Sequence, residues 1–170
     1  MDIQIIDNFL NENESQFITD FFDNHVKWAY GHNSRHGQSI KWFKSLLDNY
    51  PFFTEYLLTK INKTTKSDWE LKTVYANGQT ILLDGGWHTD TQNDDADYMT
   101  ALLYISEITP QNIDIVNGHT EFKINDEIKS IEPLKNRLII FNSKLLHRGR
   151  APSIPEMFRI SVAWKLKKKI

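Results

Sequence analysis

The second part of the chain contains the pattern that most restricts its fold: short β-rich runs separated by turn-forming residues. From Trp69 onward, Gly, Asn, Asp and Pro divide the sequence into about eight such runs. The runs are WELKTVYA, QTILL, YMTALLYIS, IDIV, TEFKI, EIKSIEP, RLIIF and FRISVAWKL. No helical pattern alternates with them, which argues against a doubly wound parallel sheet. Short strands at this spacing are typical of a sandwich or a small barrel.

Helical periodicity marks the part of the chain before Trp69. A short strand, IQIIDNFL, leads into NENESQFITDFFDNH, where apolar residues recur at helical spacing after an Asn or Ser cap. SIKWFKSLLDNY, which Pro51 ends, predicts a second helix, and FFTEYLLTKINKTT predicts a third. We therefore expect a mainly β fold with flanking helices. The expected fold is a double-stranded β-helix (jelly roll, cupin-like) over residues 69–170, with the mainly helical residues 1–68 packed on one of its sheets.

Length and composition favour one compact domain over residues 1–170. The chain has 170 residues, 40% of them hydrophobic, which is enough to bury a core, and no segment resembles a linker. The stretch MDIQIIDNFL lacks the features of a signal peptide, and no window approaches about eighteen uninterrupted apolar residues. We therefore expect a cytoplasmic protein without a membrane segment.

Charge and cysteine content restrict the partners and the chemistry. The net charge is -2, and the basic residues are scattered except in KLKKK, Lys165 to Lys169, which we interpret as a solvated chain end. Binding to nucleic acid is therefore not expected. The chain has no cysteine, which excludes thiolate nucleophiles, iron–sulfur clusters and cysteine-ligated zinc. Any metal must be held by His, Asp or Glu.

The last predicted strand places a charged side chain on its inner face. Alternation puts the apolar residues Phe158, Ile160, Val162 and Trp164 on one face and the residues Arg159, Ser161 and Ala163 on the other. If the apolar face packs against the helices, Arg159 and Ser161 point into the mouth of the barrel. A buried arginine requires an anion, which either a carboxylate of the protein or a ligand supplies.

Three residues form a candidate metal site. His88 and Asp90 are two positions apart, so on an extended segment their side chains leave the same face. His147, in SKLLHRGRAP, follows the strand RLIIF after one turn. Two neutral imidazoles and one carboxylate make the facial triad of non-haem Fe(II) oxygenases, which leaves three metal positions open. The alternative is two ordinary polar histidines and a loop aspartate.

The acidic residues after Asp90 suggest a different metal, calcium. Asp94, Asp95 and Asp97 lie close together, but no Gly occupies the turn position and no Glu closes a loop of about twelve residues. An EF-hand is therefore excluded, and we interpret these acids as a solvated loop.

The order of His88, Asp90, His147, Arg159 and Ser161 resembles that of the Fe(II)- and 2-oxoglutarate-dependent dioxygenases, and the chain is most similar to their prolyl 4-hydroxylase-like branch. Five further segments carry the resemblance: IIDNFLNENESQFITDFF, YANGQT, TALLYIS, NGHTEF and IEPLKNRLIIFNSKLLHRGRAP. It covers most of the chain and is weakest over residues 25–68. Two residues depart from the pattern, because animal and algal collagen-type enzymes carry Lys at the position of Arg159, and Asn117 replaces the first Gly of a turn. The resemblance therefore does not assign the substrate of that branch to this protein.

The resemblance implies the roles of the site residues. Fe(II) would be held by His88, Asp90 and His147, which would also be the catalytic residues. The distal carboxylate of 2-oxoglutarate would be held by Arg159 and Ser161, with hydroxyl groups from Tyr104 and, as a weaker candidate, Tyr75. The alternative for either tyrosine is an ordinary core aromatic whose hydroxyl reaches water.

The implied reaction consumes O₂ and 2-oxoglutarate and releases succinate and CO₂. It hydroxylates a C–H bond of a peptide residue, such as a prolyl residue, or of a small molecule. Ascorbate is a further candidate cofactor. An Asp ligand, rather than a small residue that leaves room for a halide, favours hydroxylation over halogenation.

Other residues near these motifs have two interpretations each. Gly118 and Thr120 belong to the turn motif and are expected to be structural. Trp87, Arg148 and Arg150 flank the candidate ligands and line either the substrate entrance or the surface around it. The segment YGHNSRHGQS, which contains His32, Arg35 and His36, is either a lid or a plain loop.

Two other classes of protein remain open. A cupin-like metal hydrolase or isomerase could use the same ligands for Zn²⁺ or Mn²⁺, but it gives no reason for Arg159 and Ser161. A non-catalytic jelly roll could bind a small acid or a peptide in the mouth of the barrel.

Overall fold

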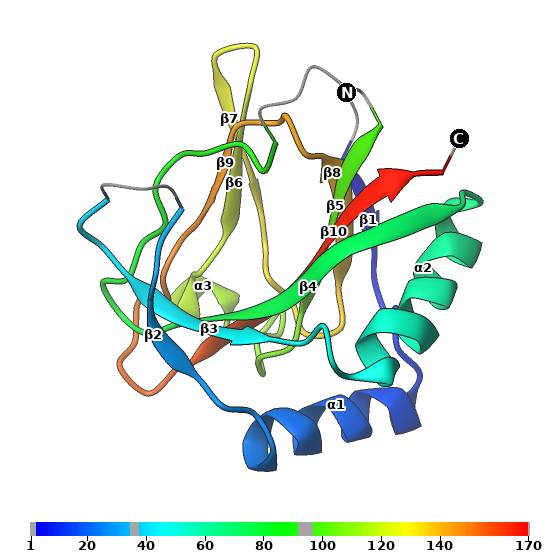
Figure 1. The fold of residues 1–170 in the computed structure, drawn as a ribbon. Helices are drawn as coiled ribbons and strands as arrows, with labels where there is room; N and C mark the ends of the chain where they lie inside the picture. Colours follow the sequence, from blue (N-terminus) through cyan, green and yellow to red (C-terminus); the bar gives the residue numbers. More distant parts are fainter. Residues whose placement is uncertain (1–2, 35–37, 92–96, 170) are drawn as a thin grey trace.

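The fold consists of two antiparallel sheets that face each other, with helices on the outside of the larger one (Figure 1). The computed structural model describes residues 3–34, 38–91 and 97–169. The larger sheet has the order β1-β8-β5-β10-β4-β3-β2. In chain order its strands are β1 (Gln4–Ile6), β2 (Ala29–His32), β3 (Trp42–Leu46), β4 (Trp69–Gln79), β5 (Tyr98–Tyr104), β8 (Leu138–Asn142) and β10 (Arg159–Lys168).

The smaller sheet has the order β7-β6-β9. Its strands are β6 (Thr120–Ile124), β7 (Glu127–Ile131) and β9 (His147–Gly149). The helices are α1 (Glu12–Asn24), the π-helical turn η1 (Phe52–Tyr56), α2 (Leu57–Thr65) and the short α3 (Ile113–Val116). This arrangement confirms the predicted double-stranded β-helix.

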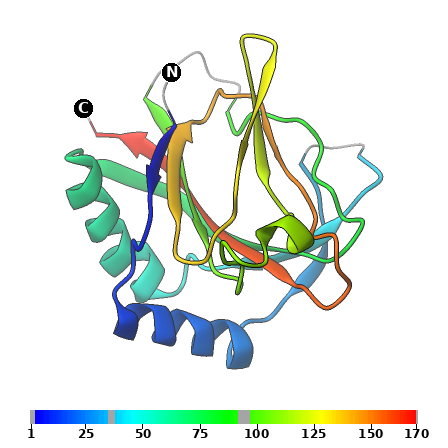
Figure 2. The same cartoon turned by 180° about the vertical axis from the view of Figure 1, so that it is seen from behind.

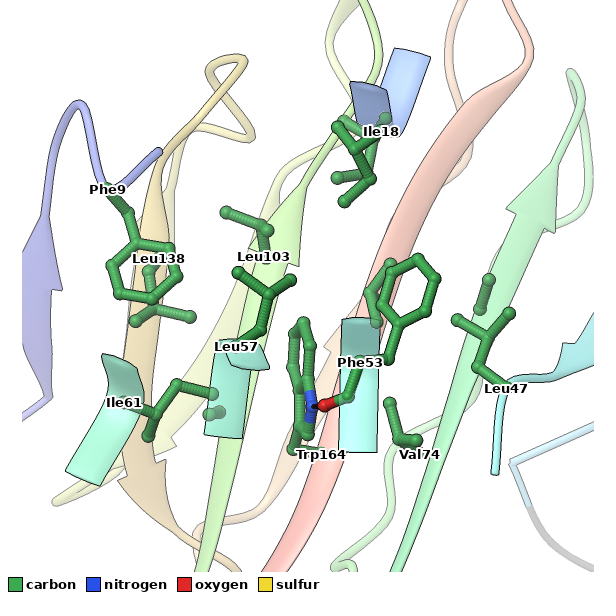
Figure 3. Close-up of a cluster of buried hydrophobic side chains, with 14 of the residues drawn as sticks. Phe9, Ile18, Leu47, Phe53, Leu57, Ile61, Val74, Leu103, Leu138 and Trp164 are labelled. Atoms are coloured by element: carbon green, nitrogen blue, oxygen red, sulfur yellow. Dashed lines mark hydrogen bonds between the residues drawn. The ribbon is translucent and has the colours of Figure 1, made fainter. Parts of the chain in front are cut away.

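The main hydrophobic core lies between the larger sheet and the helices α1 and α2 (Figures 2 and 3). Trp164 of β10 is fully buried there, and its indole Nε1 donates a hydrogen bond to the carbonyl oxygen of Phe53 at 2.9 Å. Ile18 from α1 and Leu57 from α2 pack into the same cluster. Burying side chains of this size stabilises the fold by about 1.5–3 kcal/mol each, which fixes the helices on this face of the sheet.

A second core lies between the two sheets. Phe122 of β6 and Phe141 of β8 meet there with ring centroids 4.9 Å apart. Ala163 of β10 faces this side, whereas Val162 and Trp164 belong to the core under the helices. The predicted alternation of the last strand is therefore confirmed.

The helix α1 begins as the sequence predicted. The side chain of Asn11 accepts a hydrogen bond from the backbone N–H of Glu14 at 2.9 Å, and the Glu14 carboxylate accepts one from the N–H of Asn11 at 2.7 Å. This capping box satisfies two backbone donors at the helix start. Glu14 also accepts a hydrogen bond from the Tyr56 hydroxyl at 2.7 Å and pairs with Lys60, so it ties α1 to η1 and α2.

The predicted second helix is wrong. The centre of SIKWFKSLLDNY, Trp42–Leu46, forms β3, which pairs with β4 in the register Phe43 to Gly78, and β2 extends the sheet beyond it. The Trp42 indole donates a hydrogen bond to the side chain of Asn77 at 3.1 Å. Hydrogen bonds to a distant strand outweigh the local helical spacing here. The segment between α1 and η1 is therefore β rather than helical.

Two of the predicted strands are also wrong. IDIV forms the single helical turn α3, because a run of four residues is too short for its period to separate helix from strand. QTILL contributes only Gln79 to β4, after which the chain turns and the Leu83 N–H donates to the carbonyl oxygen of Thr80 at 3.2 Å. Leu82 has φ of 69° and is 79% exposed, so this apolar residue lies outside the core.

Within the described ranges, no helix has both the length and the apolar character needed to cross a membrane.

Candidate active site

The candidate metal ligands meet where the loop after β4 crosses β9. The backbones of His88 and His147 form a β-bridge with two N–H···O bonds of 2.9 Å, and the N–H of Asp90 donates to the carbonyl oxygen of Ser143 at 2.8 Å. These bonds fix the backbone on both sides of the site. One ligand atom from each of His88, Asp90 and His147 lies within 4.8 Å of the others. The structure therefore brings the three predicted ligands together.

Both imidazoles direct Nε2 toward the cluster. His88 Nδ1 lies 2.9 Å from the carbonyl oxygen of Gly86, and His147 Nδ1 lies 2.8 Å from that of Leu145. A carbonyl oxygen only accepts, so each Nδ1 carries a proton and each Nε2 faces Asp90, 3.6 Å away in each case. Burial lowers the pKa of His147 to about 4, although Asp90 acts in the opposite direction, so this ring is neutral at pH 7.

Asp90 is ionised and held by two neighbours. Its side chain is 5% exposed, and its Oδ2 accepts a hydrogen bond from the Thr100 hydroxyl at 2.6 Å and pairs with the Lys165 ammonium. Burial raises the pKa of Asp90, but Lys165 and the two histidines more than offset it and hold the pKa well below its ordinary value. Two neutral imidazoles and one carboxylate fit a divalent ion such as Fe(II).

A cavity of about 310 Å³ between the sheets connects this cluster to Arg159. Arg159 is 2% exposed, and its guanidinium donates hydrogen bonds to the Gly118 carbonyl oxygen at 2.6 Å, Gln79 Oε1 at 2.9 Å and Thr120 Oγ1 at 3.2 Å. All three acceptors are neutral, and no carboxylate in the described parts of the chain pairs with it. An internal salt bridge therefore does not explain this buried charge, which needs an anion from outside.

Ser161 lies two residues after Arg159 on β10 and lines the same cavity, as predicted from alternation. It is 2% exposed. Gly118 has φ of 87°, in the region that favours glycine, and a Cβ there would lie 3.1 Å from the side chain of Arg159. The turn motif therefore supports the arginine directly.

The two predicted tyrosines occupy different places. Tyr75 lines the cavity, whereas Tyr104 does not. The Tyr104 hydroxyl donates to Thr120 Oγ1 at 2.8 Å, and its ring lies 5.5 Å from the guanidinium carbon of Arg159. Since Thr120 Oγ1 accepts from both Tyr104 and Arg159, its own hydroxyl hydrogen is free to be donated into the cavity that Thr120 lines.

Lys165 is the main residue of the site that was not predicted from the sequence. The tail KLKKK was expected to be solvated, but Lys165 lies on β10 and its side chain is 18% exposed. Burial lowers the pKa of Lys165, but Asp90 and Tyr75 together outweigh burial and raise it, so Lys165 stays protonated. The alternation that placed Arg159 and Ser161 inside also places Lys165 there, and extending it two residues beyond Ala163 predicts this position.

The residues expected near the entrance form ion pairs of their own. Arg148 lies over the Trp87 ring at 4.6 Å and pairs with Glu121, and Arg150 pairs with Asp84 at 3.0 Å. Neither the two arginines, nor Trp87, nor the two carboxylates that pair with the arginines line the cavity.

In the candidate lid, His32 lines the cavity. Burial lowers its pKa to about 4, with smaller contributions from Lys44, His88 and Lys165. Arg35, His36, Asp94 and Asp95 lie outside the described residues.

The structure resembles solved oxygenases over almost its whole length. An oxidoreductase of the 2OG-Fe(II) oxygenase family from Burkholderia pseudomallei matches with a TM-score of 0.76 and 9% identity, covering 98% of this chain and 85% of that chain. A prolyl hydroxylase from Trichoplax adhaerens, in complex with a hypoxia inducible factor peptide fragment, matches with a TM-score of 0.70 and 17% identity, covering 97% and 83%. HygX from Streptomyces hygroscopicus, with nickel and 2-oxoglutarate bound, matches with a TM-score of 0.71 and 12% identity, covering 99% and 83%.

The chain therefore has the fold of the Fe(II)- and 2-oxoglutarate-dependent oxygenases. No protein-family model matches the chain, and no curated protein matches it either.

Proposed function

We propose that the protein is an Fe(II)- and 2-oxoglutarate-dependent dioxygenase that hydroxylates a C–H bond of its substrate. The observation that carries the proposal is the buried guanidinium of Arg159, which has only neutral described partners and shares a cavity with His88, Asp90 and His147. A keto acid with two carboxylates suits this arrangement, because one end neutralises Arg159 while the other reaches the metal ligands.

Each residue has a defined part in the proposal. The two Nε2 atoms of His88 and His147 and the carboxylate of Asp90 hold Fe(II), which supplies the activation of O₂ when it is bound. Arg159 forms a charge-assisted, bidentate contact with the distal carboxylate of 2-oxoglutarate. Ser161 donates a hydroxyl to the same group.

The two tyrosines have different parts. Tyr75 lines the cavity beside Lys165 rather than beside Arg159, and Tyr104 acts through Thr120 as a positioning residue.

The experiment measures succinate formed by the anaerobically purified protein after addition of Fe(II), 2-oxoglutarate and O₂. We expect the wild type to form succinate and His147→Ala to form none. Arg159→Met should still bind the metal but require about tenfold more 2-oxoglutarate or more, because it loses a charge-assisted contact. Lys72→Met, on the exposed edge of β4, is the matched control and should behave as the wild type.

The same measurements separate the alternatives. A Zn²⁺ or Mn²⁺ hydrolase or isomerase would bind metal without any dependence on 2-oxoglutarate. A non-catalytic module would bind 2-oxoglutarate through Arg159 and form no succinate. If the wild type forms no more succinate than His147→Ala, the proposal is wrong.

The substrate is a peptide residue or a small molecule. The relative from Trichoplax adhaerens binds a peptide fragment, which supports the first class by analogy of fold alone. Uncoupled consumption of 2-oxoglutarate tests the activity without the substrate. Ascorbate as a further cofactor and a cytoplasmic location stay predictions from the sequence.

A further inference from the structure

Two lysines flank one tyrosine ring in the part of the site that lies away from Arg159. Lys44 Nζ lies 4.0 Å and Lys165 Nζ lies 5.6 Å from the centroid of the Tyr75 ring. Lys165 and Tyr75 line the cavity, and Lys44 follows the cavity-lining Trp42 by two residues on β3, so it faces the same side of the sheet. Arg159 is six residues from Lys165 on β10, a separation of roughly 20 Å between their Cα atoms. The cations therefore form two separate groups along the sheet.

The positive charge beside Tyr75 has little to balance it. Asp90 is the one carboxylate among the described residues that line the cavity, and it pairs with Lys165. If Asp90 ligates a divalent cation through Oδ1, Lys165 keeps its contact with Oδ2, but the cation takes up the negative charge of the carboxylate and the positive charge of Lys165 is no longer balanced. Lys44 forms no ion pair with any carboxylate of the described ranges, although Asp48 lies close enough to raise its pKa. Burial and the charge of Lys165 outweigh Asp48 and lower the pKa of Lys44.

The other polar side chains around Tyr75 add no charge. His32 contacts the Tyr75 ring with centroids 5.8 Å apart, and it is a neutral imidazole. The buried hydroxyl of Ser34, which has no hydrogen-bond partner among the described residues, lies instead near Gly85 and Gly149, toward Arg159. Apart from Lys165 and Asp90, the described residues that line the cavity around Tyr75 carry no charge.

We propose that the substrate carries an anionic group, a carboxylate or a phosphate, which Lys44 and Lys165 bind beside Tyr75. The inference rests on the proposed oxygenase function and narrows its substrate class. Arg159 takes the distal carboxylate of 2-oxoglutarate, and the lysine pair takes the anion of the second molecule. An uncharged prolyl side chain supplies no negative charge to the two ammonium groups, so an anionic substrate fits this site better than a prolyl residue.

The test is calorimetric titration of the Ni(II)-loaded protein with inorganic phosphate and, separately, with acetate, before and after saturation with 2-oxoglutarate. We expect Lys44→Met and Lys165→Met to weaken binding of the preferred anion by about tenfold or more each. Lys165→Arg keeps the charge and should bind within a few fold of the wild type. Lys72→Met, an exposed lysine on β4, should bind like the wild type. The anion that binds more tightly identifies the chemical class.

Lys44→Met is the cleaner variant, because Lys44 does not contact the candidate metal ligands. Its thermal unfolding is compared with that of the wild type, so that a folding defect is recognised. The inference is overturned if neither anion binds the wild type, or if Lys44→Met and Lys165→Met bind as tightly as Lys72→Met. Failure of 2-oxoglutarate itself to bind overturns the proposed function instead, and the anion titrations with Ni(II) alone still decide the role of the lysines.

Discussion

At the scale of single residues, Asp90 has its two carboxylate oxygens in different surroundings. Oδ2 receives the Thr100 hydroxyl at 2.6 Å and the Lys165 ammonium, while Oδ1 lies 3.6 Å from Nε2 of His88. The contacts on Oδ2 fix the plane of the carboxylate before any metal binds. Neighbours that orient a metal ligand in this way contribute to metal affinity without touching the metal.

Thr100→Val removes the hydroxyl that Asp90 accepts while keeping the shape of the side chain. We expect the affinity for Fe(II), or for Co(II) as a stable substitute, to fall by about tenfold or more. Metal titration followed by absorption or calorimetry measures the change. Thr19→Val, on α1 and distant from the site, is the control and should leave the affinity unchanged. Equal affinities of Thr100→Val and the wild type would show that Oδ2 needs no such support.

At the scale of elements, Glu14 joins α1 to the following helical segment. Its carboxylate completes the capping box with Asn11, accepts the Tyr56 hydroxyl and pairs with Lys60. Burial raises the pKa of Glu14, but these contacts outweigh the burial and lower the pKa below its ordinary value. Because the pKa in the folded state is the lower one, the ionised group stabilises the fold above its unfolded pKa. This stability is lost as the pH falls through the folded pKa.

Glu14→Gln therefore has an effect that depends on pH. At pH 7 we expect the free energy of unfolding to fall by about 1–2 kcal/mol, because a charged hydrogen-bond acceptor is lost from a buried position. Below pH of about 4 the difference from the wild type should shrink, since Glu14 is then becoming protonated in both folded and unfolded states. Urea unfolding at several pH values measures it. Glu12→Gln, exposed in the same helical turn, should change stability by less than about 0.5 kcal/mol, and a pH-independent loss for Glu14→Gln would contradict the explanation.

At the scale of the whole molecule, the candidate metal site joins the two sheets. His147 begins β9 in the smaller sheet, His88 follows β4 of the larger sheet, and Asp90 contacts Thr100 of β5 and Lys165 of β10. A ligand that bridges these elements binds the folded state and not the unfolded chain. That residues 1–170 form a single domain stays a prediction.

Metal binding should therefore stabilise the whole fold. With free Co(II) at about a hundred times its Kd, linkage predicts about 2.7 kcal/mol of added stability, which corresponds to roughly 5–10 °C in Tm. Thermal unfolding with and without metal measures the shift, and a chelator should reverse it. His147→Ala should show no shift. An equal shift in His147→Ala would mean that the metal binds elsewhere.

The local sequence pattern was enough to predict the helices and strands that bury one regularly spaced face. Most of the β-rich runs over residues 69–170, the capped helix that begins after Asn11, and the inward direction of Arg159 and Ser161 followed from alternation and capping, and the structure agrees. The order of His88, Asp90 and His147 along the chain identified them as candidate metal ligands. These features depend on residues that are neighbours in the sequence, so they can be predicted from the sequence alone.

Tertiary structure alone decided the rest. The residues around Trp42 became the strand β3 because β4, about thirty residues further along the chain, offered hydrogen bonds to them. Lys165 became a buried cation because β10 continues past Trp164 beside Asp90, which lies on a separate loop. The sequence by itself determined which side chains face inward, since side-chain direction is a local property of the backbone. Which of those side chains meet was decided by the pairing of distant strands, because contacts across the cavity depend on segments far apart in the chain.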